Sequence, residues 1–227
     1  MKIIAANWKM NKTNKEAKLF FAQYGKLVRK PKNQVMFFVP FTALQNLPNT
    51  VMPGAQNFHP AKSGAFTGEI SLEQLAEMGV RVVLAGHSER RALFGETDQF
   101  IREKVKSALN LNLKVILCIG ETLKERQKKK TEAALKRQLE NISPHKDLCI
   151  AYEPVWAIGT GLTPTPEQIK QTHAYIKSLV NVAVLYGGGV NEKNCKEILS
   201  IPNVDGVLVG TASLAPDKFA AVVNCNE

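Results

Sequence analysis

Short apolar runs alternate with helix signals along the whole chain, and this alternation constrains the fold more than any other feature. The runs cover residues 3–8, 35–39, 55–57, 82–85, 115–119, 148–153, 182–186 and 207–209. They are apolar throughout, as is typical of parallel strands buried on both faces. Eight strands separated by helices in 227 residues predict an α/β fold, a single (β/α)8 TIM barrel domain over residues 1–227. An open doubly wound sheet shares the alternation and is the alternative.

Capping boxes mark the starts of several helices. In this pattern a Ser or Thr side chain accepts from the backbone three residues on, where a Glu or Gln reaches back. The sequence has it at residues 13–16, 71–74, 122–125 and 165–168. The first box should open a helix with an apolar face at Ala17, Phe20, Phe21, Tyr24 and Val28. Further helices are expected from about 42 to Pro48, over 97–109, from 122 to about 141, from 166 to about 180, from Asn191 to before Pro202, and near the end of the chain.

The bulk properties exclude some classes of protein. No apolar run approaches the roughly 18 residues of a membrane span, and the four apolar residues before Asn7 are too few for a signal peptide. We therefore expect a cytoplasmic protein without membrane association. Cys118, Cys149, Cys195 and Cys225 are far apart in sequence, which suggests neither a metal pair nor a disulfide framework.

The net charge of +10 fits either a small anionic substrate or non-specific nucleic-acid binding. The densest basic run, residues 128–130 with Lys136 and Arg137, lies on the helix expected from 122 and has acidic neighbours at Glu125 and Glu132. No aromatic residue interleaves with these lysines, which weakens a stacking platform for single strands. We interpret the run as a solvent-facing helix surface and expect no nucleic-acid partner.

Polar residues stand where several strands end, and in a barrel the active site gathers at these carboxyl ends. The strand 148–153 ends at Glu153, because Pro154 cannot donate to a ladder. The loop that follows has an apolar tip and two glycines, which suits a lid that excludes water from the carboxylate. The alternative is an ordinary strand-to-helix connection with a buried Trp156.

The first strand runs into Lys9. Successive side chains of a strand alternate, so Asn7 and Lys9 should point one way and Trp8 the other. An inward amide and ammonium favour an anionic ligand, whereas a lysine that snorkels to water is the alternative for Lys9.

The fourth strand is followed by a histidine. Ser88 can cap a helical turn whose backbone N–H groups donate toward His87, which disfavours the protonated imidazole. The alternative is a structural or surface histidine, which is our interpretation of His59, His145 and His173.

Glycines follow the last two strands, at residues 187–189 and at Gly210. Glycine lets the backbone approach a ligand closely, and N–H groups at helix starts bind anions. Barrels commonly bind phosphate after strands seven and eight, so these glycines predict a phosphate site.

Six segments together, in this order, resemble the triosephosphate isomerase family: residues 7–9 (NWK), 64–69 (GAFTGE), 86–91 (GHSERR), 151–161 (AYEPVWAIGTG), 186–188 (YGG) and 208–210 (LVG). The resemblance covers nearly the whole chain. It implies an aldose–ketose isomerase that interconverts dihydroxyacetone phosphate and D-glyceraldehyde 3-phosphate through an enediolate, with no metal and no cofactor. Such an isomerase serves glycolysis and gluconeogenesis and touches the pentose phosphate pathway.

The resemblance also implies a role for each site residue. Glu153 would move the proton, and His87 would polarise and protonate the carbonyl oxygens as a neutral imidazole. This family is itself a standard example of that pairing, so the two roles are the family's and not new assignments. Lys9, positioned by Asn7, would stabilise negative charge and attract the phosphate, while Ser88 and Glu89 would orient the set. The implied substrate-binding residues are Asn7, Lys9, Gly159, Gly189, Gly210 and Thr211, and the implied lid residues are Pro154, Val155, Trp156, Ala157, Ile158, Thr160 and Gly161.

The resemblance further implies a homodimer, in which the loop with Phe66, Thr67 and Gly68 docks near the partner's Asn7 and the partner's His87. Some positions depart from the family. Gly189 replaces a usual Ser whose hydroxyl bonds to the closed lid, Thr211 replaces a second Gly, residues 162–164 read LTP instead of KTA, and residues 178–184 are fewer than usual.

Two other functions compete with this interpretation. Another phosphate-binding barrel, such as a pentose-phosphate epimerase, needs metal-binding His and Asp at strand ends, which the sequence does not offer. A non-catalytic basic protein that binds nucleic acid is the alternative from a different class.

Overall fold

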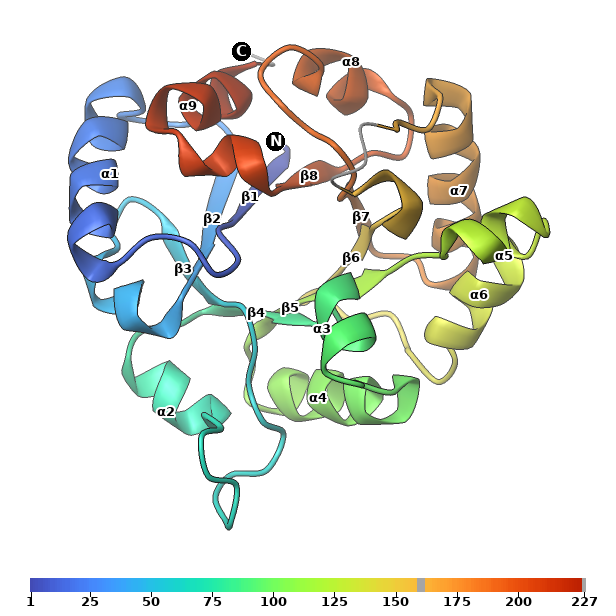
Figure 1. Cartoon of the computed structure of the whole chain (residues 1–227), viewed down its shortest axis with the longest axis horizontal. Helices are drawn as coiled ribbons and strands as arrows, with labels where there is room; N and C mark the ends of the chain where they lie inside the picture. The colour runs from blue at the N-terminus through green and yellow to red at the C-terminus, as the bar shows by residue number, and fades with distance from the viewer. Residues whose placement is uncertain (159–161, 226–227) are drawn as a thin grey trace.

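The computed structural model describes residues 1–158 and 162–225, and these form a closed barrel of parallel strands (Figure 1). The strands are β1 (Ile3–Asn7), β2 (Gln34–Val39), β3 (Met52–Ala55), β4 (Val82–Ala85), β5 (Lys114–Ile119), β6 (Leu148–Tyr152), β7 (Ala183–Tyr186) and β8 (Gly206–Val209). β8 pairs with β1, with Gly206 opposite Ile3, which closes the ring. The predicted (β/α)8 barrel is confirmed, and the open doubly wound sheet is excluded.

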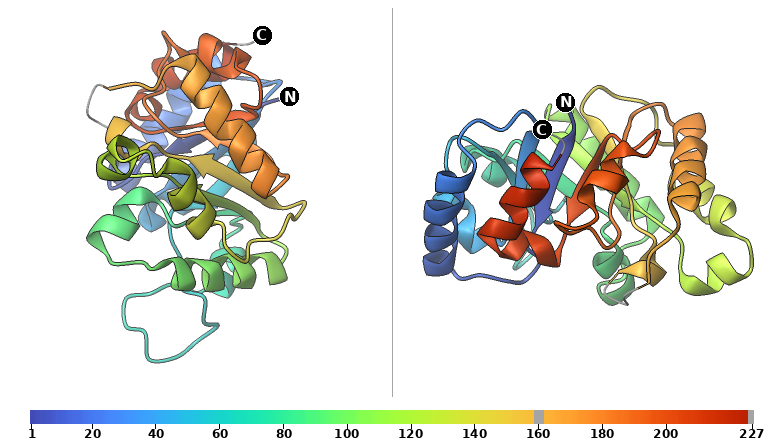
Figure 2. Two further views of the ribbon diagram at one scale, coloured as in Figure 1. Left: turned by 90° about the vertical axis from the view of Figure 1, so that its right-hand side faces the viewer. Right: turned by 90° about the horizontal axis from the view of Figure 1, so that it is seen from above.

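Helices surround the strands on the outside (Figures 1 and 2). They are α1 (Asn14–Leu27), α2 (Leu72–Glu77), α3 (Ser88–Leu93), α4 (Asp98–Asn110), α5 (Leu123–Gln127), α6 (Thr131–Gln138), α7 (Pro166–Leu179), α8 (Cys195–Ser200) and α9 (Pro216–Asn224), with 3₁₀ turns η1 (Phe41–Asn46), η2 (Val155–Ala157) and η3 (Thr211–Leu214). The predicted capping boxes all form, at Thr13, Ser71, Thr122 and Thr165. Within the described residues, no helix has the length and apolar character needed to cross a membrane.

The strands bury both faces in separate apolar cores. One core fills the barrel with Ala5, Met36, Phe38, Val82, Leu84, Ile116, Cys118, Ala151, Leu185 and Leu208. Alternate side chains point outward against the helices, where Trp8 packs on Phe20, Phe21 and Phe37 with ring centroids 4.9, 5.4 and 5.9 Å away. Because both faces are covered, the strand sequences are apolar throughout.

The third strand begins earlier than predicted. It spans Met52–Ala55 instead of 55–57, and it therefore includes Pro53 and Gly54. Pro53 can stand in the strand because its carbonyl still accepts from the N–H of Arg81, at 3.0 Å. A Cβ at Gly54 would lie 2.6 Å from the ring of Phe38, so the glycine makes room for that ring inside the barrel.

The single helix predicted from 122 to about 141 is instead two helices, α5 and α6. α5 ends in a Schellman motif: the N–H of Lys129 donates to Arg126 O at 3.0 Å, and the N–H of Lys130 to Glu125 O at 2.8 Å. Lys129 adopts a left-handed conformation, with φ 54°, which ends the helix. The basic run 128–130 therefore lies in the turn between the helices and not on a helix face.

Three other segments also differ in detail from the predictions. The segment from about residue 42 forms the 3₁₀ turn η1, and α3 follows β4 where the sequence predicts only a helical turn. Asn191 caps a turn, because its Oδ1 accepts from the N–H groups of Lys193 and Asn194 at 2.9 and 3.3 Å. α8 itself begins only at Cys195.

Candidate active site

A cavity of about 730 Å³ opens at the carboxyl ends of the strands. Residues that follow β1, β4, β6, β7 and β8 meet in its wall, although they are far apart in sequence. The predicted site residues among them are Asn7, Lys9, His87, Glu153, Ala157, Ile158, Gly189, Gly210 and Thr211. The structure thus brings the four predicted catalytic residues together with three of the predicted substrate-binding residues, Gly189, Gly210 and Thr211.

Glu153 and His87 form a buried pair in this cavity. The Glu153 side chain has its Oε1 3.2 Å from His87 Nε2, and its Oε2 accepts from the backbone N–H of Ser88 at 3.0 Å. His87 Nδ1 accepts from the N–H of Glu89 at 3.3 Å. A ring nitrogen that accepts a hydrogen bond carries no proton, so these bonds assign the neutral tautomer with its proton on Nε2. His87 can therefore donate from the nitrogen that faces the cavity.

The residue that caps the helical turn after β4 differs from the prediction. His87 itself is the N-cap of α3, and Ser88 is the first helical residue. A capping side chain accepts from the N–H groups of the first turn, which here bind the imidazole directly. The expectation that Ser88 caps the turn is therefore wrong, whereas the donation of a backbone N–H to the imidazole is confirmed.

Two glycines hold the strand of Glu153 in place. A Cβ at Gly120 would lie 1.7 Å from the carbonyl oxygen of Glu153, and a Cβ at Gly187 would lie 2.9 Å from its Cγ. The N–H of Glu153 donates to Ile119 O at 2.7 Å, and that of Gly187 donates to Tyr152 O at 2.8 Å. The end of β6 is thus clamped between β5 and β7 with no space for larger residues.

Lys9 extends into the cavity from a strained backbone. Its φ of 52° is unusual for a residue with a side chain. Two hydrogen bonds hold this conformation: the Lys9 N–H donates to Asn7 Oδ1 at 3.0 Å, and Gln56 Nε2 donates to Lys9 O at 2.9 Å. Lys9 Nζ lies 2.6 Å from Glu89 Oε1. The opposite orientation of Trp8 is confirmed, since its Nε1 donates to Ser213 O at 3.1 Å.

Sequence reasoning did not single out Gln56. It stands directly after β3, so it belongs with the other polar residues at strand ends. The signal was hidden because the predicted strand, 55–57, included this position.

The first part of the lid, up to Ile158, is anchored by Glu121, another residue that sequence reasoning missed. Glu121 Oε1 accepts from Trp156 Nε1 at 2.9 Å and from Tyr152 OH at 3.1 Å, and Arg126 Nη1 lies 3.4 Å away. Burial raises the pKa of Tyr152, so its phenol stays protonated and donates. Glu121 also follows the end of a strand, β5, and this position could have revealed it. Gly159, Thr160 and Gly161 lie outside the described residues.

The glycines after β7 and β8 form another part of the cavity wall. A Cβ at Gly189 would meet nothing within 4 Å, and one at Gly210 would lie 3.7 Å from Lys9 Cε. The carbonyl of Gly189 accepts from Asn194 Nδ2 at 2.8 Å, which ties this loop to the start of α8. The wall therefore has open space beside exposed backbone, as a phosphate site requires.

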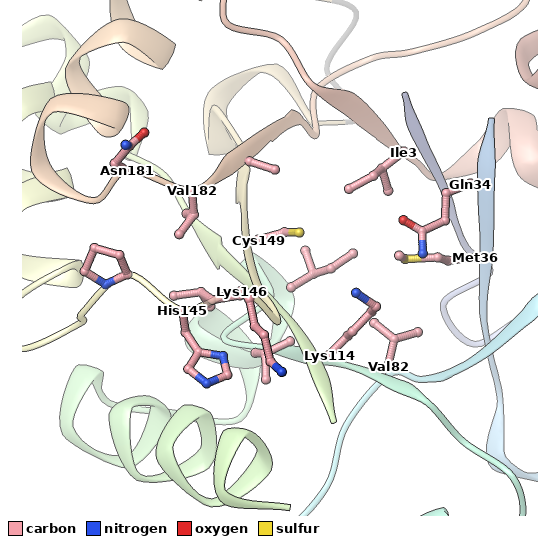
Figure 3. Close-up of a pocket in the computed structure, with 15 residues that line it drawn as sticks. Ile3, Gln34, Met36, Val82, Lys114, His145, Lys146, Cys149, Asn181 and Val182 are labelled. Atoms are coloured by element: carbon pink, nitrogen blue, oxygen red, sulfur yellow. The ribbon is translucent and has the colours of Figure 1, made fainter. Parts of the chain in front are cut away.

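A second cavity of about 530 Å³ lies at the opposite end of the barrel (Figure 3). Its wall includes Ile3, Lys114, Cys149 and Val182. Burial raises the pKa of Cys149 to about 11, and Lys114 Nζ lies 3.6 Å from Asp147 Oδ1. A protonated thiol is a poor nucleophile, so Cys149 does not mark this cavity as a second reactive site.

The comparisons with known proteins agree with this geometry. The chain matches the family model described as "Triosephosphate isomerase" over residues 2–226. It is 44% identical to the triosephosphate isomerase of Aquifex aeolicus, and the match covers 98% of each chain. The identity to the triosephosphate isomerase of Alkaliphilus metalliredigens is also 44%, again over 98% of each chain. On its sequence and its site, this chain belongs to the triosephosphate isomerase family.

Proposed function

We propose that this chain interconverts dihydroxyacetone phosphate and D-glyceraldehyde 3-phosphate, as an intramolecular oxidoreductase of glycolysis and gluconeogenesis. The observation that carries the proposal is the buried Glu153–His87 pair, which shares one cavity with the glycines after β7 and β8. The electrons are rearranged within one substrate molecule, so the reaction needs no external redox partner. Family membership supports a cytoplasmic location and a link to the pentose phosphate pathway.

Glu153 acts as the base in this proposal. It removes a proton from the carbon beside the carbonyl and returns it to the neighbouring carbon. At the same time His87 Nε2–H donates to the carbonyl oxygen, which gives an enediolate. His87 protonates this oxygen and takes the proton of the neighbouring hydroxyl, so that the carbonyl and hydroxyl groups exchange places and His87 is neutral again. When the substrate binds, Glu153 must give up its contacts with Ser88 and His87 and lie against the substrate carbon instead. Closure of the lid then excludes water. This family's lid is itself a familiar example of such gating.

The remaining residues bind and orient the substrate. Lys9, held by Asn7, contributes positive charge beside the reacting oxygens. The backbone N–H groups of Gly189 and Gly210, with Thr211, receive the phosphate, because they line the same cavity. Gly159 completes this set in the proposal.

We also propose that the active form is a homodimer. The segment between β3 and α2 protrudes from the barrel (Figures 1 and 2), and Phe66, which belongs to this segment, is 45% exposed. The rings of Phe66 and His59 lie 4.0 Å apart, so the loop is braced from within. A braced loop with an exposed aromatic ring, together with Thr67 and Gly68, is suited to insertion into a second copy.

The test is turnover of D-glyceraldehyde 3-phosphate in a coupled spectrophotometric assay, without added metal and with a chelator present. Steady conversion supports the proposal. Absence of turnover at micromolar enzyme overturns it, and binding of the same sample to single-stranded nucleic acid at physiological salt would instead support the nucleic-acid alternative.

A further inference from the structure

Three lysines line the active-site cavity, and they differ in what surrounds them. Lys9 is paired with Glu89 at 2.6 Å, while Lys193 adjoins Glu192, which lines the same wall. Lys218 lines the cavity too, and the ion pairs found among the described residues do not include it. Lys193 is likewise absent from those ion pairs, and Lys218 follows Asp217 as Lys193 follows Glu192, so both differ from Lys9 in lacking a paired carboxylate.

The position of Lys218 in the fold adds a second observation. It is the third residue of α9, which starts shortly after η3, and Thr211 and Leu214 of η3 line the same cavity. The N-terminal turn of a helix carries partial positive charge, so a lysine there lowers helix stability. A residue that opposes the local helix preference and faces a cavity is more readily explained by a ligand than by the fold.

We propose that Lys218 is a specificity-determining residue, whose ammonium adds positive charge at the phosphate end of the cavity and favours dianionic substrates. The inference rests on the proposed function, because it assigns the wall of Gly189, Gly210 and Thr211 to the phosphate. It adds a side chain from α9 to a site otherwise formed by loop backbone and by Lys9.

The first experiment measures binding of inorganic phosphate by calorimetric titration at low ionic strength. Lys218→Gln should weaken phosphate binding about two- to five-fold, the range of an exposed charge pair. Lys196→Gln, which removes the same charge from α8 outside the cavity wall, should leave it unchanged. Glu192→Gln should tighten binding, and at about 1 M inert salt the variants should converge. Equal weakening by Lys218→Gln and Lys196→Gln would reduce the effect to net charge and overturn the inference.

The second experiment separates this role from a structural one. Lys218→Gln should raise KM for triose phosphate with little change in kcat, because the charge acts on binding and not on proton transfer. The same variant should melt at an equal or higher temperature, since it removes a cation from a helix start. A lower melting temperature with a matched loss of kcat would overturn the inference. If the wild-type protein did not turn over triose phosphate, the proposed function would fail, while the phosphate titration would still decide the role of Lys218.

Discussion

The proposed proton transfer depends on two side chains whose orientation is set by backbone groups. The N–H of Ser88 binds the carboxylate of Glu153, and the N–H of Glu89 binds His87 Nδ1. Both donors belong to the first turn of α3, so one short helix orients the base and the acid together. The acid–base pair is thus fixed by peptide groups, which do not titrate.

Glu153→Gln should lower kcat by about 10²- to 10⁴-fold, because the amide keeps the shape of the side chain but cannot take the proton. Circular dichroism should show an unchanged fold. Glu132→Gln, on the outer helix α6, is the matched control and should retain full activity. A near-normal kcat for Glu153→Gln would remove Glu153 from the role of base.

The stability of the fold should also depend on pH, through the buried residue His173, which does not line the active-site cavity. Burial lowers its pKa to about 4, and its Nδ1 lies 3.1 Å from Asn203 O. The unfolded chain takes up a proton near pH 6.5 and the folded chain only near pH 4, so stability falls as the pH drops through this window. The loss is on the order of 3 kcal/mol.

His173→Gln should flatten this acid dependence, since glutamine can still donate to Asn203 O and does not titrate. The measurement is the free energy of unfolding by urea at several pH values between 4 and 7, at one protein concentration. His145→Gln, at a more exposed histidine, should leave the slope unchanged. The same slope in wild type and His173→Gln would show that other groups control the acid limb.

At the scale of helices and strands, the capping boxes predicted where four helices begin, whereas the end of α5 was not predicted. Helix starts depend on capping side chains that can be recognised in the sequence, and the four predicted capping boxes are present in the structure. The end of α5 depends on Lys129 in a left-handed conformation, a residue that gives no signal in sequence. Gln56 was missed because the predicted strand 55–57 included it, whereas Glu121 was missed although the end of β5 at Ile119 was predicted correctly.

Lys129→Gly should stabilise the protein by about 0.5–1 kcal/mol, because glycine adopts the left-handed conformation without the cost that a Cβ brings. Gly79 already occupies the equivalent position after α2, with φ 83°. Lys128→Gly, one residue earlier at φ −85°, is the control and should stabilise nothing. Thermal unfolding of the three proteins provides the measurement, and a gain from both variants would point to charge relief instead.

The lid is one element in which the resemblance predicts a departure from the family. Gly189→Ser would add a hydroxyl that can bond to the closed loop, which is worth about 0.5–1.5 kcal/mol. The structure accepts the change, since a Cβ at Gly189 meets nothing within 4 Å. We expect the variant to bind the transition-state analogue phosphoglycolate about 2- to 13-fold more tightly and to eliminate less phosphate from the enediolate.

Gly189→Ala controls for loss of glycine freedom alone. We expect Pro164 to limit the conformational freedom of the open loop and to offset part of the effect of the missing hydroxyl in the wild type. Unchanged analogue affinity and unchanged methylglyoxal formation in Gly189→Ser would show that other contacts close the lid.

The whole molecule combines one closed barrel with a loop that reaches beyond it. The ring of strands followed from the sequence alone, because eight buried strands with helices between them have few ways to pack. Closure through the pairing of β1 with β8 supports the proposal that residues 1–227 form one domain. Assembly is a different matter, since one chain does not show what covers its loop.

Phe66→Ser should weaken the proposed dimer and lower activity per chain on dilution, because the exposed ring is an apolar part of the protruding loop. Light scattering and kcat measured over the same range of concentration would show the two losses together. Leu27→Ser removes an equally exposed apolar side chain from α1 and should change neither. A Phe66→Ser protein that is monomeric and fully active would separate catalysis from assembly.

The glycines packed against Glu153 and the glycine at the phosphate wall determine in which direction this enzyme can be redesigned. A side chain at Gly120 or Gly187 collides with the strand that carries the base, so any enlargement there displaces Glu153 itself. A side chain at Gly189 enters empty space. Engineering toward longer phosphorylated sugars should therefore change residues at the phosphate wall. The position of Glu153 should be left unchanged, and each new substrate has to place its reacting carbon beside this carboxylate.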